Sequence, residues 1–226
     1  VETLGFFGLK PGMTVVEIWP GAGWYTDILA PFLAASGGKL YAANLQPHDP
    51  IAIEVVEAYR QKLRAKPRLY GDVEITAFGA TSGPMAPAGS ADLVLTARNV
   101  HNWMAAGIVD KAFSDAFAAL KPGGVFGVVE HRANPGGGQD PTAADGYVEQ
   151  AYVIRLAQEA GFILDQASEI NANPRDTKDH PFGVWTLPPV RRTSARGQPA
   201  DPTFDSSPYE AIGESDRMTL RFIKPT

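Results

Sequence analysis

The sequence of 226 residues contains no cysteine. This excludes a disulfide framework, a thiolate metal site and a cysteine nucleophile. No apolar run approaches the roughly 20 residues that a membrane-spanning helix requires. No charged-then-apolar leader is recognisable at the start, but the chain begins at Val1 and not at methionine. The compartment therefore stays open between the cytoplasm and, if an export signal once preceded Val1, the periplasm.

Clustered positive charge is also scarce. The chain carries 20 Lys and Arg against 25 Asp and Glu, a net charge of -5, and Arg191 with Arg192 forms a pair and not a patch. Proteins that bind nucleic acid usually present grouped Lys and Arg. We expect a small-molecule ligand, with no nucleic-acid or membrane partner, and the oligomeric state is not indicated.

The first two-thirds of the chain alternates β-rich runs with helical stretches, which is typical of a parallel sheet covered by helices on both faces. The predicted strands are residues 14–18, 39–44, 72–77, 92–97, 125–130, 162–170 and 217–223. The predicted helices are residues 24–35, 51–65, 110–120 and 148–160. This pattern predicts one α/β domain over residues 1–226.

The alternation stops between about residues 171 and 215, where Pro, Asp, Ser, Thr and Arg are frequent. An irregular segment of this length is uncommon in a compact domain and often serves as a lid or a binding loop. We predict a lid-like insertion between strands six and seven that folds back over a ligand site.

The sequence EIWPGAGWYT, residues 17–26, joins the first strand to the first helix. Glycines at such a junction let the backbone approach a ligand and expose helix N-terminal amides to it. A lone G-x-G is a weak signal, but here it follows a buried strand and the acid Glu17. Trp19, Trp24 and Tyr25 flank this loop and either meet the ligand or, in the case of Trp19, cover the sheet.

The sequence RNVHNW, residues 98–103, directly follows the fourth predicted strand. Ligands of open α/β sheets bind outside the carboxyl ends of the strands, so these residues are candidates for the pocket. The alternative is that Trp103 packs on the sheet and Arg98 pairs with a surface acid. His131 and His180 are expected near the same rim as His101, as general bases, as metal ligands or as structural residues.

These motifs resemble class I S-adenosylmethionine (SAM) methyltransferases, whose first motif is an acid followed by a G-x-G loop. More closely, the chain resembles a family of bacterial methyltransferases with EIWPGxGWYT, RNVHNW, NPxDTxDHP and VWTLPP motifs. The matching residues are 17–26, 98–103, 173–181, 184–189 and, near the C-terminus, IGESDR at 212–217. The resemblance thus covers almost the whole chain.

The resemblance implies a three-layer, Rossmann-like sheet with strand order 3-2-1-4-5-7-6 and strand seven antiparallel. It implies SAM as the cofactor, with Gly21 and Gly23 under its methionyl part and Glu17 receiving its ammonium group. The cofactor-binding candidates are Glu17, Pro20, Gly21, Ala22, Gly23, Tyr25, Thr26, Asn44, Leu45 and Asn99. The catalytic candidates are His101 as a base and Arg98, Asn102 and His180 as residues that orient the methyl acceptor, with Lys178 assisting Arg98 if the acceptor is a carboxylate.

Two residues depart from the general methyltransferase pattern. Pro20 replaces the first glycine of the loop, which fixes φ and removes an N–H donor. Asn44 stands where a carboxylate normally receives both ribose hydroxyls, and a neutral acceptor is weaker than a charged one. Asp49 in the following loop is a possible substitute. These departures predict reduced SAM affinity or a different ligand.

Three functions remain open at this stage. The first is a SAM-dependent methyltransferase that acts on a small molecule. The second is a metal-assisted hydrolase or lyase that uses His101, His131 and His180, although their spacing matches no ligand motif and our prediction is that no metal binds. The third is a non-catalytic binding protein that has lost SAM. Tyr147 and Trp185 either line the substrate side or pack in the core and the lid.

Overall fold

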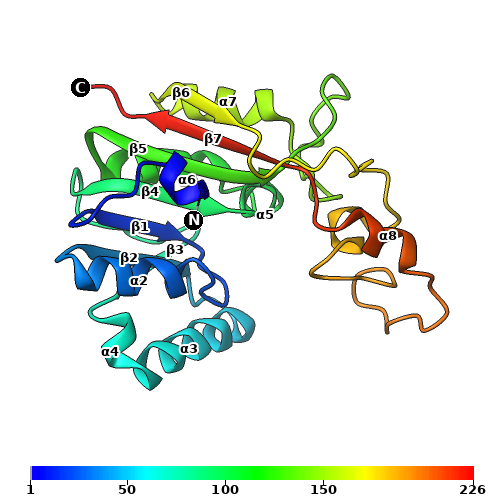
Figure 1. Cartoon of the computed structure of the whole chain (residues 1–226), viewed down its shortest axis with the longest axis horizontal. Coiled ribbons are helices and arrows are strands. Elements are labelled where there is room, and N and C mark those ends of the chain that lie inside the picture. Colours follow the sequence, from blue (N-terminus) through cyan, green and yellow to red (C-terminus); the bar gives the residue numbers. More distant parts are fainter. Residues whose placement is uncertain (1) are drawn as a thin grey trace.

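The computed structural model describes residues 2–226, and seven strands form one twisted sheet within them (Figure 1). The strands are β1 (Thr14–Ile18), β2 (Lys39–Leu45), β3 (Glu74–Phe78), β4 (Ala91–Ala97), β5 (Leu120–His131), β6 (Ile163–Ser168) and β7 (Arg217–Ile223). Their order is β3-β2-β1-β4-β5-β7-β6, and β7 runs antiparallel to both of its neighbours. The predicted fold class and strand order are confirmed.

Helices cover both faces of the sheet. The helices are α1 (Glu2–Phe6), α2 (Thr26–Ala35), α3 (Pro50–Ala65), α4 (Pro67–Tyr70), α5 (Val100–Ala105), α6 (Val109–Ala119), α7 (Gln150–Glu159), the 3₁₀ turn η1 (Gly183–Thr186) and α8 (Ser207–Ile212). Because successive side chains of a strand point to opposite faces, β1 supplies two separate cores. Val15 packs with α1, α2 and α4, whereas Val16 and Ile18 pack with α5, α6 and α7.

Residues 98–103 do not stay a loop after β4. Helix α5 begins at Val100, and its side chains Val100 and Trp103 are fully buried in the core. The prediction that the whole of residues 98–103 lines the pocket is therefore wrong for Trp103, and the alternative, that Trp103 packs against the sheet, is correct.

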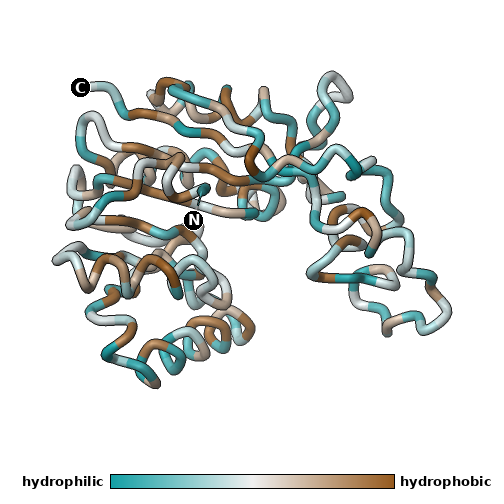
Figure 2. Tube along the Cα trace, in the orientation of Figure 1, coloured by the Kyte–Doolittle hydropathy of each residue, from teal (hydrophilic) through white to brown (hydrophobic). Residues whose placement is uncertain are grey.

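The segment between β6 and β7 leaves the sheet at the carboxyl-end edge and returns to it at β7 (Figure 1). It contains η1 and α8 and little other regular structure. In Figure 2 brown lies mainly along the central strands, whereas this segment is mostly teal and white. Within the segment, Phe204 packs against both Phe182 and Tyr209.

No helix among residues 2–226 combines the length and apolar character needed to cross a bilayer.

Candidate active site

A cavity of about 310 Å³ lies at the carboxyl ends of β1, β4 and β5. Three parts of the chain form most of its wall: the loop after β1, the residues after β4 and the segment before β7. The lining residues are Trp19, Pro20, Gly21, Ala22, Trp24, Ala97, Arg98, Asn99, His101, Asn102, His131, Val184, Trp185, Pro188, Pro189, Val190, Glu214, Ser215 and Arg217. Residues far apart in the sequence therefore converge on one space, as expected at this edge of the sheet.

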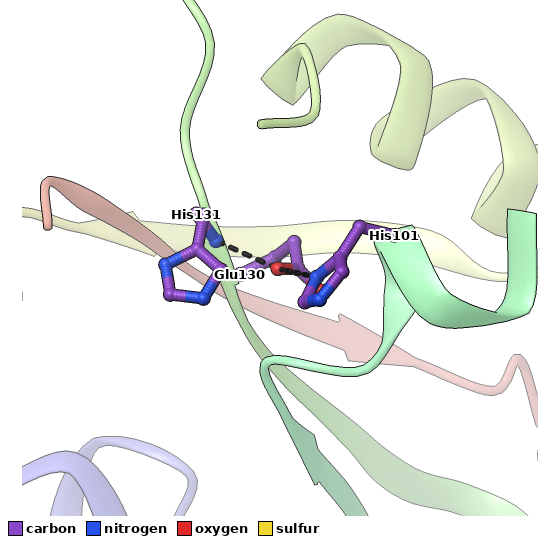
Figure 3. Close-up of side chains that lie close together, drawn as sticks. All are labelled: His101, Glu130 and His131. Atoms are coloured by element: carbon purple, nitrogen blue, oxygen red, sulfur yellow. Dashed lines mark hydrogen bonds and ion pairs between the residues drawn. The ribbon is translucent and has the colours of Figure 1, made fainter. Parts of the chain in front are cut away.

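The central pair of the site is His101 and Glu130. His101 lies on α5, Glu130 lies near the end of β5, and Nδ1 of His101 is 2.9 Å from Oε1 of Glu130 (Figure 3). Glu130 is 0% exposed, and its two oxygens also accept hydrogen bonds from the backbone N–H groups of Val100 and His131. Three donors thus hold the carboxylate, and it in turn fixes the imidazole ring.

Burial opposes ionisation of Glu130. Electrostatic attraction and a hydrogen bond from the His101 ring, together with the hydrogen bond from the His131 amide, outweigh this effect and hold the pKa of Glu130 below its usual value. The carboxylate is therefore charged at neutral pH. With Nδ1 engaged, Nε2 of His101 is the ring nitrogen left to exchange a proton with a ligand in the cavity.

His131 forms a second pair with Ser215, whose Oγ lies 2.6 Å from Nδ1 of the histidine. Burial is the main cause that lowers the pKa of His131 to about 3; His101, Arg98 and Arg217 act in the same direction, against the attraction of Glu130. His131 is therefore a neutral imidazole at pH 7. Its ring lies 5.3 Å from that of His101, so the two histidines form one wall of the cavity.

Two arginines give the cavity a positive character. Arg98 follows β4 with φ of 61°, a backbone conformation that is strained for a residue with a side chain. Arg217, the first residue of β7, is paired in register with His131 and forms an ion pair with Glu214. Burial and the charge of Arg98 lower the pKa of Arg217. No carboxylate among residues 2–226 lies within 4 Å of the Arg98 guanidinium, so its donors are available to a ligand.

A metal ion at this place is less well supported. His101, Glu130 and His131 do offer ligand atoms within 4.8 Å of one another. However, three N–H donors already occupy the oxygens of Glu130, and two guanidinium groups nearby oppose the approach of a cation.

The structure does not bring His180 to this cavity. Its Nε2 lies 2.8 Å from Oδ1 of Asp176, and its ring packs against Tyr209. The same Asp176 accepts hydrogen bonds from the hydroxyl of Tyr147 and from the backbone N–H of Asp216. His180 thus helps to anchor the 171–215 segment to β7, and the expected shared rim of three histidines is not observed.

Other candidate residues divide between the cavity and the protein interior. Lys178 pairs with Asp216 at 2.9 Å and does not line the cavity, whereas Asn102 does. Asn99 touches the cavity, but its Nδ2 donates to the carbonyl oxygens of Ile18 and Trp19. Asn99 therefore joins the ends of β1 and β4.

Several solved structures share this fold. A SAM-dependent methyltransferase from Aquifex aeolicus is 22% identical over 74% of this chain and 81% of its own, with a TM-score of 0.59. The [4+2]-cyclase SpnF is 15% identical over 100% of this chain and 79% of its own, with a TM-score of 0.65. A TehB-like SAM-dependent methyltransferase from Corynebacterium glutamicum is 15% identical over 98% and 85%, with a TM-score of 0.53.

No protein-family model matches the chain, and no curated protein matches its sequence. At these identities the solved structures show the fold of the class I methyltransferases alone. That one neighbour is named a cyclase agrees with the rule that a shared fold does not fix the reaction.

The residues predicted for the SAM ammonium and ribose do not line the cavity. Glu17 is buried, and it accepts a 2.6 Å hydrogen bond from Thr26, whose hydroxyl also lies 2.9 Å from that of Tyr59. Burial raises the pKa of Glu17 to about 7, against the hydrogen bond from Thr26. Glu17 therefore already has a hydrogen-bond partner in Thr26.

The side chain of Asn44, at the end of β2, is likewise turned into the protein. Asn44 is buried, its Oδ1 accepts from the backbone N–H of Leu45, and its Nδ2 has no partner among the described residues. Asp49 does not replace it, because its side chain caps α3 by accepting from the N–H of Ala52. Glu17 and Asp49 thus already have partners within the protein, whereas Nδ2 of Asn44 is a buried donor without one among the described residues. Of the cofactor candidates, Pro20, Gly21, Ala22 and Asn99 line this cavity, and Tyr25 lines an adjoining one of about 410 Å³.

Glu130, Ser215 and Arg217 were not among the predicted site residues. An acid at the end of a buried strand was a usable signal for Glu130, because an ionised group there needs partners. Ser215 and Arg217 belong to the IGESDR motif, whose sequence alone does not indicate a role in the site. The pairing of β7 with β5 brings these residues to the cavity.

Proposed function

We propose that this protein is an enzyme that acts on a small molecule with an oxyanionic group, with His101 as its general base. The observation that carries the proposal is the buried His101–Glu130 pair in the wall of a cavity that also contains Arg98 and Arg217. The His101–Glu130 pair, the two arginines and the aromatic residues of this cavity each have a separate role.

The pair suits proton transfer. Glu130 accepts from Nδ1 of His101, which leaves Nε2 unprotonated in the neutral ring and stabilises the imidazolium that forms when it takes a proton. A positioned base of this kind typically contributes about 10²–10⁴-fold in rate. Since His101 is 5% exposed, a ligand would meet it with little competing water.

The two arginines suit an oxyanion. Two guanidinium groups that line one cavity repel each other, and a bound carboxylate or phosphate would relieve that repulsion while accepting from their N–H donors. Glu214 partly neutralises the charge of Arg217, so a bound anion would interact more strongly with Arg98.

The aromatic residues suit a planar or apolar body. Trp19, Trp24 and Trp185 line the cavity, and the ring of Trp185 packs edge-on against His101 at 5.9 Å. Large rigid side chains with a few directed polar groups are typical of small-molecule sites. Together these features favour a small aromatic or unsaturated acid, or its phosphate counterpart.

A thermal-shift panel tests the binding half of the proposal. We would titrate the protein with inorganic phosphate, aliphatic carboxylates and aromatic carboxylates at constant ionic strength, beside Arg98→Gln. The matched control is Arg155→Gln, whose guanidinium pairs with Glu159 on the exposed face of α7. We expect at least one acid to raise the melting temperature of wild type and R155Q by several degrees and to lose this effect in R98Q. An equal response of all three proteins would contradict an anion site at Arg98.

Acids that bind would then be followed by NMR for conversion. His101→Gln should reduce conversion by about 10²-fold or more, whereas His48→Gln, at an exposed histidine, should not change it. Unchanged turnover in H101Q would exclude His101 as the base.

A second candidate function rests on the fold. Methyltransferases among the neighbours favour a SAM-dependent methyltransferase that acts on a small molecule, with His101 removing the proton of the acceptor. It requires an adenosyl cofactor to bind in a way that does not use Glu17 or Asn44 as the resemblance implies. Adding SAM and S-adenosylhomocysteine to the same panel separates the two candidates.

A further inference from the structure

The side chain of Trp19 crosses the end of the sheet from β1 to β3. Its indole Nε1 donates to the carbonyl oxygen of Phe78, the last residue of β3, at 3.0 Å. In this sheet β2 lies between β1 and β3, and neighbouring strands are about 4.8 Å apart. The indole therefore passes over the end of β2, where the resemblance places the adenosine of SAM.

The indole is packed on both edges. Its ring lies 6.0 Å from that of Phe78 and 6.1 Å from that of Trp103 in tilted and edge-on contacts. The remaining side of Trp19 faces the cavity. A bicyclic ring thus already fills a flat apolar slot, with its N–H donor satisfied.

The backbone of Trp19 is strained to achieve this. Its φ is 50°, in the left-handed region that glycine enters freely and that a bulky residue rarely adopts. The strain falls on Trp19 and not on Pro20, which was the expected departure in this loop. Hydrogen bonds from its N–H to Ala43 and from Asn99 to its carbonyl hold the conformation. A strained residue held from all sides indicates a function for its placement.

Helix α3 fills the other face of the glycine loop. Lys62 Nζ donates to the carbonyl oxygens of Ala22 and Gly23 at 2.7 and 3.2 Å, and to Asp27 at 2.8 Å. A Cβ atom on Gly23 would meet Lys62 Nζ at 3.0 Å and Tyr59 at 3.2 Å. Gly23 therefore lies in close contact with Lys62 and Tyr59 of α3, which occupy this side of the glycine loop.

We infer that the protein occupies the cofactor groove of this fold with its own side chains, Trp19 at the end of β2 and Tyr59 and Lys62 at the glycine loop, and that it binds its ligand without an adenosyl cofactor. The ligand site is then confined to the cavity between the loop after β1 and the ends of β4, β5 and β7. This inference is compatible with the general-base function proposed above and stands independently of it.

The direct test is titration of wild type with SAM, S-adenosylhomocysteine and adenosine. We expect no calorimetric heat of binding and no change in melting temperature at 1 mM of each compound. Binding of S-adenosylhomocysteine with a dissociation constant below about 100 μM would overturn the inference. That outcome would leave the anion response of Arg98 untouched, so the two proposals fail separately.

A cavity-rescue experiment tests the role of the indole. Trp19→Gly removes the ring and relieves the positive φ, and free indole should then enter the slot, as apolar ligands enter engineered cavities. We expect 5 mM indole to raise the melting temperature of W19G by about 2 °C or more, without effect on wild type. Trp24→Ala, at a tryptophan that is 64% exposed, is the matched control and should not respond. Equal responses of W19G and W24A would contradict a filled slot, and if W19G does not fold, the wild-type titration decides alone.

Discussion

Nδ1 of His101 on α5 lies 2.9 Å from Oε1 of Glu130 on β5, and this contact joins the helix after β4 to the neighbouring strand. It places a proton acceptor at the cavity and a buried negative charge directly behind it. The pair is therefore both a structural and a chemical element, and the two roles respond differently to substitution.

Glu130→Gln should destabilise the protein by about 2–4 kcal/mol. The carboxylate accepts from three N–H donors, and an amide would turn one of its two acceptor atoms into a fourth donor. His101→Gln keeps a donor toward Glu130 and should cost less. Urea denaturation of both variants provides the comparison, and equal losses would argue against a saturated carboxylate.

Glu17→Gln should change how stability depends on pH. The folded-state pKa of Glu17 is raised to about 7, so between about pH 4.5 and 7 the native state holds this proton more tightly than the unfolded state. Stability is therefore lost as the pH rises through this window, by up to about 3 kcal/mol from this group. The difference in unfolding free energy between E17Q and wild type should grow in favour of E17Q from pH 5 to pH 8. His131, with its lowered pKa, contributes the opposite slope at lower pH equally in both proteins. A constant difference would show that Glu17 titrates normally.

Arg98→Gly should be more stable than Arg98→Ala by about 1 kcal/mol. Arg98 has a φ of 61°. Alanine is strained at this φ, whereas glycine adopts it freely. Both variants should lose the anion response, because both lack the guanidinium. Thermal denaturation with and without the ligand acid measures the two effects. A less stable glycine variant would contradict backbone strain at this position.

Asp176→Ala should release the 171–215 segment while the sheet stays folded. Asp176 accepts from Tyr147 and from the backbone N–H of Asp216, which both lie outside the segment, and it also contacts His180 within the segment. Limited proteolysis should cut the variant within residues 171–215 much faster than wild type. Asp179→Ala is the control, since Asp179 is exposed and contacts Thr177 within its own turn. Equal cleavage of the two variants would show that Asp176 does not anchor the segment.

The alternation of β-rich runs and helices was enough to predict all seven strands, because the run of apolar residues that marks each strand is local in the sequence. The bounds differed by a few residues, as for β6, and the short helices α1, α4, α5 and α8 were missed because they lack a full amphipathic repeat. That the chain forms one domain with a lid-like insertion stays a prediction, although Trp185 and its neighbours do line the cavity.

The site was harder to predict, for a physical reason. His101 and Arg98 follow a strand end directly and could be placed from the sequence. The partners of Glu17 could not, because Tyr59 and Lys62 come from α3, and nothing in their sequence shows that they turn toward the glycine loop. The direction of the Trp19 side chain depends equally on Phe78 and Trp103, which lie about 60 and 80 residues away.

The register of β7 against β5 pairs Arg217 with His131 at the very start of the last strand. The residues just before it, Glu214 and Ser215, enter the cavity wall through this same pairing. Because β7 lies between β5 and β6 in the sheet, the same strand that carries Arg217 into the cavity wall also attaches β6 to the sheet. A substitution that weakens the pairing of β7 with β5 should therefore disturb the edge of the sheet and the cavity together.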